Sequence, residues 1–225
     1  MNKIILTPSQ FIAKGRDRAC YHHPTQKDLC IKVAIKPEKQ SLREKSYFQF
    51  LTQKNVNLHF ISQYRGEVLT NFGKGYLFDL ALNHDGKLSQ TLKQAIQTGV
   101  LSQQETQQLL STLKHYLEDN LICVKDLSPN NLAYVTTDNK TKHLFIIDGL
   151  GNPNNNPFTI RIKFLIQKAS NKTWTRLERK VTHLFQPNTH AQYLQNKTPK
   201  TNKRQPFIVL SIIIIITSFA LLSVE

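Results

Sequence analysis

The chain has 225 residues, with 30 Lys or Arg against 15 Asp or Glu, and a formal net charge of +15. This length allows one ordinary domain with a hydrophobic core and some additional sequence. Three cysteines without CxxC spacing argue against a disulfide framework or a zinc site and favour reduced thiols in a cytoplasmic protein. The positive charge is concentrated in residues 157–204, where 11 Lys or Arg accompany a single acid, so this segment either meets an anionic partner or forms a solvated basic surface.

The first third of the chain has the pattern of a sheet with one helix. Strand-like residues run from 7 to 36 and include a short apolar strand at 29–35. The sequence Ser-Leu-Arg-Glu at 41–44 matches a capping box, which predicts that a helix begins there. Two more strands are expected at 61–69 and 75–82.

After residue 85 the hydrophobic period becomes helical. A second capping box at 102–105 opens a predicted helix, and a short buried segment follows at 121–124. Residues 131–135 and 143–147 are expected to form the two strands of a hairpin. Residues 159–184 are expected to form one or two basic helices.

The last part of the sequence differs from the rest because residues 207–224 carry no charge. As a helix this run would be about 27 Å long, close to the thickness of the hydrocarbon layer of a bilayer. Lys200, Lys203 and Arg204 precede it, as expected for a cytoplasmic flank. We therefore expect a transmembrane helix at 207–224, joined by a basic polar linker at 187–206 to a cytoplasmic domain held at the inner membrane. A buried strand or an aggregation-prone tail is the alternative interpretation.

Two polar segments flank the predicted hairpin. In the sequence VKDLSPNN, Asp126 is followed five residues later by Asn131, which resembles the catalytic loop of the protein-kinase-like fold. At the far end of the hairpin, IIDG places Asp148 before Gly149, where kinases have their metal-binding aspartate.

Three upstream segments extend this resemblance. The sequence CIKV, with Lys32, resembles the strand that carries the phosphate-binding lysine of kinases, and Gly15 lies in an earlier turn where the phosphate-covering loop belongs. Phe78, Asp79 and Leu80 resemble the hinge whose backbone pairs with adenine.

The runs KGRDRACYHHP, LCIKV, LREKSYFQFL, KDLSPNN and IIDGLGNP together resemble the YrbL family, which is named for the bacterial PhoP regulatory network and has a kinase-like fold. The resemblance covers residues 9–185 and omits the apolar tail. It implies an α+β, reduced bilobal protein-kinase-like fold. The N-lobe would span residues 1–82, mostly antiparallel sheet with one helix, and the helical C-lobe would span 83–186.

The resemblance implies a role for each matching residue. Lys32 would hold the α and β phosphates of ATP and would be oriented by an ion pair with Glu44. Asp126 would accept the proton of the attacking hydroxyl, while Asn131 and Asp148 would coordinate Mg²⁺. Simpler interpretations exist: Lys32 as a solvent-facing strand residue, Glu44 as part of the capping box, and the loop residues as ordinary turn formers.

The sequence also departs from the kinase pattern. The glycine-rich loop keeps only Gly15, a loss for which Arg16 or Arg18 would compensate. No peptide-docking lobe follows Asp148. These departures favour a small-molecule, sugar or lipid-linked acceptor over a protein substrate.

The expected function is therefore an ATP- and Mg²⁺-dependent phosphotransferase at the cytoplasmic membrane face, with anionic lipids as partners and an unidentified phosphate acceptor. Two alternatives stay open: a nucleotide-binding pseudokinase that serves as a regulatory scaffold in a bacterial stress or PhoP-type network, and a basic membrane-tethered adaptor. Aromatic residues are few among the basic ones, so no specific nucleic-acid partner is expected, and Trp174 is expected to anchor the core.

Overall fold

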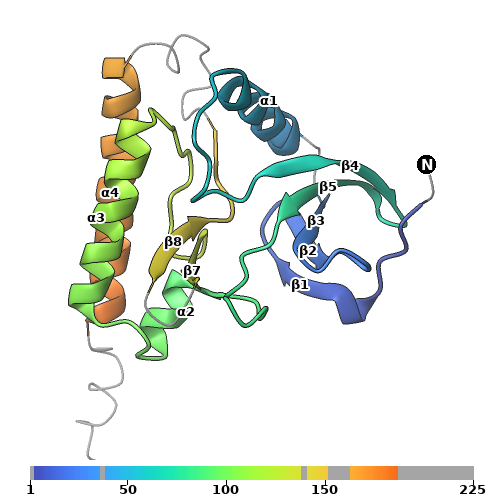
Figure 1. Ribbon diagram of the computed structural model, residues 1–225, viewed down its shortest axis with the longest axis horizontal. Coiled ribbons are helices and arrows are strands. Elements are labelled where there is room, and N and C mark those ends of the chain that lie inside the picture. Colours follow the sequence, from blue (N-terminus) through green and yellow to red (C-terminus); the bar gives the residue numbers. More distant parts are fainter. Residues whose placement is uncertain (1–2, 36–38, 138–140, 152–162, 187–225) are drawn as a thin grey trace, which may run out of the picture. The chain divides into compact units, whose positions relative to one another are not determined.

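The strand-like segments of the first third form one antiparallel sheet in the computed structural model of the protein (Figure 1). The structure describes residues 3–35, 39–137, 141–151 and 163–186. A 3-10 turn, η1 (Pro8–Gln10), precedes the sheet. The five strands lie in the order β1-β2-β3-β5-β4, with the bounds β1 (Phe11–Lys14), β2 (Arg18–His22), β3 (Leu29–Ala34), β4 (Tyr64–Thr70) and β5 (Gly73–Asp79). The apolar strand predicted at 29–35 is therefore confirmed as the central strand β3.

Helix α1 (Lys39–Gln53) lies against this sheet and buries its apolar residues Tyr47, Phe48 and Leu51. The helix begins before Ser41, so the prediction that Ser41 caps it was wrong. Ser41 is instead an interior helical residue, and its buried hydroxyl has no hydrogen-bond partner among the described residues. Glu44 is then free of a capping role and turns toward the interior.

A second, three-stranded sheet has the order β6-β7-β8, with β6 (Gln90–Thr91), β7 (Leu132–Thr136) and β8 (Lys142–Ile146). Strands β7 and β8 are antiparallel neighbours, which confirms the predicted hairpin. The residues of its turn at 138–140 lie outside the described part of the chain.

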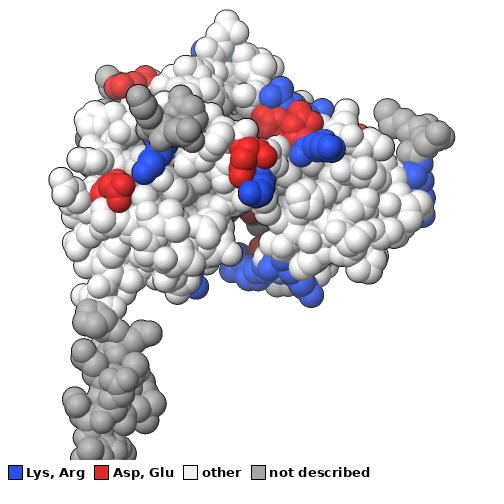
Figure 2. All heavy atoms as spheres, turned by 60° about the horizontal axis from the view of Figure 1, so that its bottom comes forward, with Lys and Arg blue, Asp and Glu red and all other residues white. Residues whose placement is uncertain are grey.

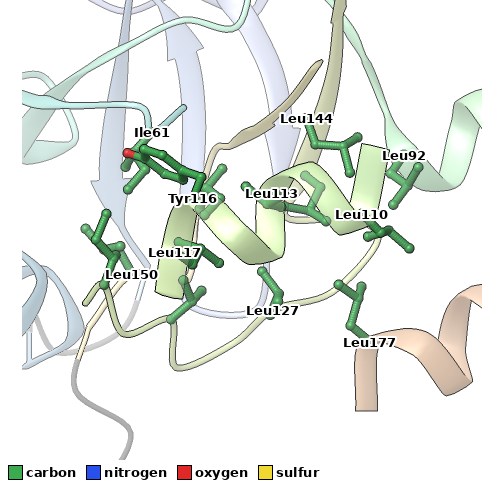
Figure 3. Close-up of a cluster of buried hydrophobic side chains, with 14 of the residues drawn as sticks. Ile61, Leu92, Leu110, Leu113, Tyr116, Leu117, Leu127, Leu144, Leu150 and Leu177 are labelled. Carbon is green, nitrogen blue, oxygen red and sulfur yellow. The ribbon is translucent and has the colours of Figure 1, made fainter. Parts of the chain in front are cut away.

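Three further helices, α2 (Leu92–Gln97), α3 (Gln103–Asp119) and α4 (Lys163–Phe185), accompany the second sheet. The second capping box is confirmed: the Glu105 N–H donates to the Ser102 hydroxyl over 3.2 Å, and the Glu105 carboxylate accepts from the Ser102 N–H. The buried face of α3 carries Leu110, Leu113 and Leu117. In the main core these residues belong to one hydrophobic cluster with residues of other elements, which include Ile61, Leu92, Leu127, Leu144 and Leu177 (Figure 3).

Within the predicted basic helical region, the described residues 163–185 form the single helix α4, which runs beside α3 (Figure 1). Trp174 on α4 is buried, as predicted, and its indole N–H donates to Glu178 over 2.8 Å. Residues Met1–Phe185 pack as one compact unit. The chain thus has a mixed α+β fold with antiparallel sheets.

Within the described ranges, none of the helices is both long and apolar enough to cross a bilayer. The predicted linker at 187–206 and the predicted membrane helix at 207–224 lie outside the described residues.

Candidate functional site

A cleft of about 820 Å³ opens between β2 and β3 of the first sheet and the loops that flank β7 and β8. Figure 2 shows the hollow, with Lys and Arg side chains along one edge. Its lining includes most of the site residues predicted from the sequence: Gly15, Lys32, Asp79, Leu80, Asp126, Asn131 and Asp148. Positive side chains among the lining are Lys14, Arg16, Arg18, Lys32 and Lys93.

Lys32 faces this cleft from the middle of β3. Lys32 is only 7% exposed, so the interpretation of Lys32 as a solvent-facing strand residue was wrong. The ammonium donates a hydrogen bond to the Ile147 carbonyl over 2.6 Å and lies 4.1 Å from the centre of the Phe78 ring. The amine is thereby held next to the segment that carries Asp148.

Glu44 pairs with Arg18 and not with Lys32. The guanidinium of Arg18 donates to the Glu44 carboxylate over 2.5 Å, and a second N–H donates to the Asp148 carboxylate. No ion pair joins Lys32 to Glu44 in the described part of the chain, which corrects the expected kinase-like pairing. Arg18 projects from the same sheet face as Lys32. Its longer, forked side chain can bind two carboxylates at once, which explains why Glu44 pairs with Arg18.

The electrostatics of this cluster follow from its burial. Burial raises the pKa of Glu44, which is 3% exposed, although Arg18 and Lys32 act in the opposite direction. Burial also tends to raise the pKa of Asp148, but Lys32, Arg18 and the Gly149 N–H outweigh it and hold that pKa below its usual value. The pKa of Arg18 is raised: its two carboxylate partners outweigh the burial that would lower it. Asp148 is thus an ionised carboxylate whose side chain is 34% exposed to the cleft.

The loops before β7 and after β8 are joined by backbone contacts. The N–H groups of Lys125 and Asp126 both donate to the Gly149 carbonyl, over 2.8 and 3.1 Å. The Asn131 amide donates to the Asp126 carbonyl over 2.8 Å, and the Asp148 carboxylate accepts from the Gly149 N–H over 2.6 Å. Asp126, Asn131 and Asp148 therefore belong to one hydrogen-bonded arrangement at the edge of the cleft, with the Asp126 side chain exposed.

Gly149 makes this arrangement possible. Its φ of +86° lies in the left-handed region, and a Cβ there would come within 2.3 Å of the Asp126 carbonyl oxygen. The sequence pattern assigned Asp148 to a metal site, with an ordinary turn as the alternative, and gave Gly149 no role. The structure shows that a glycine is required for the two loops to touch.

Replacing Gly149 with alanine is expected to destabilise the protein by about 2 kcal/mol or more, because backbone strain and a steric clash with backbone atoms add together. The matched control is Gly86→Ala, since Gly86 has a φ of +76° and a Cβ added there would meet no atom within 4 Å. Urea unfolding of both variants measures the difference. Equal losses in the two would contradict the close approach at Gly149.

The segment assigned to an adenine hinge is only partly suited to that role. Phe78 is buried behind Lys32, and the N–H groups of Asp79 and Leu80 already donate to the carbonyls of Gln63 and Asp28. The next residue, Ala81, lines the cleft, and its N–H has no acceptor among the described residues. Ala81 was missed because a backbone donor leaves no mark in the sequence.

Gly15 lies in the turn between β1 and β2, where its N–H donates to the Arg18 carbonyl over 2.8 Å. A Cβ at Gly15 would meet only that carbonyl oxygen, at 3.5 Å. The position therefore does not require glycine, in keeping with the reduced glycine loop noted in the sequence. Arg18 was considered only as a compensating residue, and its part in the site was missed. The signal available was Glu44, an acid on an apolar helix face that needs a buried cation.

Comparison with known proteins supports the resemblance seen in the sequence. Residues 4–182 match the family model described as PhoP regulatory network protein YrbL. The YrbL proteins of Escherichia coli (strain K12) and Shigella flexneri are each 29% identical to the chain over 179 residues, which cover 77% of this chain and 85% of each relative. Since the family model spans most of the chain, the protein belongs to the YrbL family.

Proposed function

We propose that the protein is an ATP- and Mg²⁺-dependent phosphotransferase with a reduced bilobal protein-kinase-like fold. In this proposal the first sheet with α1 is the N-lobe, and the second sheet with α2, α3 and α4 is the C-lobe. The observation that carries the proposal is the meeting of the Lys32 ammonium with the loop of Asp148 inside one cleft that Asp126 and Asn131 also line.

The residues present fit a metal–nucleotide complex. The Asp148 carboxylate and the Asn131 amide supply the hard oxygen atoms that Mg²⁺ prefers, and the volume of the cleft is in the range of small-molecule sites. Bound there, ATP would supply the phosphoryl group and Mg²⁺ would neutralise its charge. Because Arg18 now holds Asp148, that contact would have to open or be shared when a metal binds.

The chain's own groups would then divide the work. Among the described residues Lys32 donates to one carbonyl, which leaves two more N–H donors for phosphate oxygens. Leu80 and Ala81 line the wall where adenine would pair with the Ala81 N–H, for which the described residues supply no acceptor. Asp126, exposed at the cleft, would accept the proton of the acceptor hydroxyl.

The acceptor and the location are part of the same proposal. The acceptor would be a small-molecule, sugar or lipid-linked hydroxyl that reaches the exposed Asp126 side chain in the cleft. A membrane helix at 207–224, with anionic lipids near the basic segment, would place the enzyme at the cytoplasmic face of the inner membrane. The proposed membrane helix lies outside the described residues, whereas residues 163–185 of the basic segment form helix α4.

Lys32→Met and Asp148→Asn should each weaken Mg²⁺–ATP binding to the full-length protein roughly tenfold to a hundredfold, since each removes one contact to a charged group. The Asp148 variant should lose mainly the Mg²⁺-dependent part of the affinity. Calorimetric titration with and without Mg²⁺ measures both effects. Lys27→Met and Asp119→Asn, exposed residues away from the cleft, are the matched controls. Unchanged affinity in both site variants would reject the proposal.

A nucleotide-binding pseudokinase is the second candidate, and a specific observation favours it. Glu44 and Asp148 are both engaged by Arg18, so the pairing that marks an assembled kinase site is absent from the described structure. A pseudokinase would bind nucleotide with the dependence described above but would turn over no acceptor. Incubation with labelled ATP, Mg²⁺ and candidate hydroxyl acceptors separates the two candidates.

A further inference from the structure

Two cysteines share the cleft face of the first sheet with the two buried cations. In the register of β2 and β3, Cys20 lies opposite Lys32, and His22 lies opposite Cys30. Since side chains alternate along a strand, Arg18 and Cys20 on β2 and Cys30 and Lys32 on β3 project from one face. All four residues line the cleft.

The two thiols differ in access. Cys20 is half-buried at the cleft, whereas Cys30 is only 3% exposed beneath it. Each of these two thiols influences the pKa of the other. The third cysteine, Cys123, is fully buried in the main core beside the hydroxyl of Tyr47, away from the cleft lining.

The surroundings of the three thiols also give them different pKa values. The neighbouring Cys30 thiol lowers the pKa of Cys20; burial opposes this, Lys32 and Arg18 lower the pKa further, and Asp148 raises it. The Cys20 thiol, together with burial, raises the pKa of Cys30. Burial raises the pKa of Cys123 to about 11. The accessible thiol is therefore also the more acidic one.

We propose that Cys20 is an oxidation site of this protein, a cleft thiolate that reacts with hydroperoxides. Its sulfur attacks the terminal peroxide oxygen, an S–O bond forms as the O–O bond breaks, and hydroxide or alkoxide leaves with the electron pair. The sulfenic acid so formed gives its proton to this leaving group, which yields the sulfenate and water or an alcohol. Sulfur loses two electrons to form the sulfenate, and the peroxide gains them. Lys32, directly opposite on β3, stabilises both the thiolate and the sulfenate that replaces it.

This inference stands without the proposed function, but it has a consequence that rests on it. An oxidised Cys20 keeps a negative charge and adds an oxygen beside Lys32 and Arg18, the cations assigned to phosphate. Oxidation would then weaken nucleotide binding.

Site-resolved labelling tests the proposal on the reduced, full-length protein. With limiting iodoacetamide, mass spectrometry of the peptides should show Cys20 alkylated at least about tenfold faster than Cys123 or Cys30. After hydrogen peroxide, dimedone should mark Cys20 and should mark no site in Cys20→Ser. Equal alkylation rates for Cys20 and Cys123 in the folded protein, or dimedone on another cysteine first, would overturn the proposal.

A second variant tests the role of the cation. Lys32→Met should slow the alkylation of Cys20 several-fold at neutral pH, while Lys27→Met should not change it. An unchanged rate in Lys32→Met would overturn the assigned environment even if Cys20 is accessible. Protection of Cys20 by Mg²⁺–ATP is measured in parallel: fast labelling without protection would count against the nucleotide site and leave the oxidation site standing.

Discussion

In the proposed phosphotransferase, replacing Asp126 with asparagine should lower the rate of phosphoryl transfer by roughly 10²–10⁴-fold while leaving Mg²⁺–ATP affinity nearly unchanged, because only the proposed proton acceptor is removed. The backbone contacts of the loop survive the substitution: the Asp126 N–H still donates to Gly149, and the Asp126 carbonyl still accepts from Asn131. Turnover of labelled ATP with an acceptor hydroxyl, together with calorimetric binding, measures both quantities.

The control for this variant is Asp119→Asn, an exposed aspartate at the end of α3. A full rate in Asp126→Asn would remove Asp126 from the reaction. Loss of binding in the same variant would instead indicate that Asp126 belongs to the metal or nucleotide site. Absence of turnover in the unmodified protein with intact binding would favour the pseudokinase.

The elements that the sequence predicted well are those fixed by local patterns. Helix α3 begins at its capping box because Ser102 and Glu105 satisfy each other's N–H groups within one turn. The run 29–35 was recognisable as a strand because β3 is buried on both faces and is apolar except at Lys32.

The same kind of pattern was misleading at Ser41. The sequence 41–44 has the form of a capping box, yet α1 begins at Lys39. Ser41 therefore lies within the helix and is buried by the surrounding protein. A capping box involves only the backbone of the first helical turn, whereas the position of the Glu44 side chain is determined by Arg18, 26 residues away in the sequence. Tertiary pairing of the acid outweighed the local cap.

The candidate site shows the same division. The order of Lys32, Asp126, Asn131 and Asp148 along the chain was enough to suggest that they meet, since each lies in a recognisable local element. The identity of the ion pairs was not predictable, because Arg18 reaches Asp148 across 130 residues of sequence. A buried carboxylate pairs with one of two neighbouring cations according to side-chain length and strand register. Neither of these can be read from a local sequence pattern.

Loss of Arg18 should be the most destabilising single change in the cleft. Arg18→Met leaves the Glu44 carboxylate buried without its main partner, which is expected to reduce the free energy of unfolding by about 3–5 kcal/mol. Methionine keeps most of the apolar stem, so the loss reflects charge and hydrogen bonding more than packing. Urea unfolding measures it, and Arg16→Met, whose side chain is 84% exposed, should change stability by less than about 0.5 kcal/mol.

The double variant Arg18→Met/Glu44→Met separates the cost of an unpaired charge from the value of the pair. Removing both partners should restore much of the lost stability, since a buried ion pair is often replaceable by apolar side chains of similar size. If the double variant is as unstable as the sum of the two single variants, the Arg18–Glu44 pair is not coupled and the arrangement described for the cleft is wrong. Recovery of stability would instead assign Glu44 to Arg18. The Lys32 ammonium, which donates to the Ile147 carbonyl and lies over the Phe78 ring, would then be available for the phosphate of the proposed nucleotide.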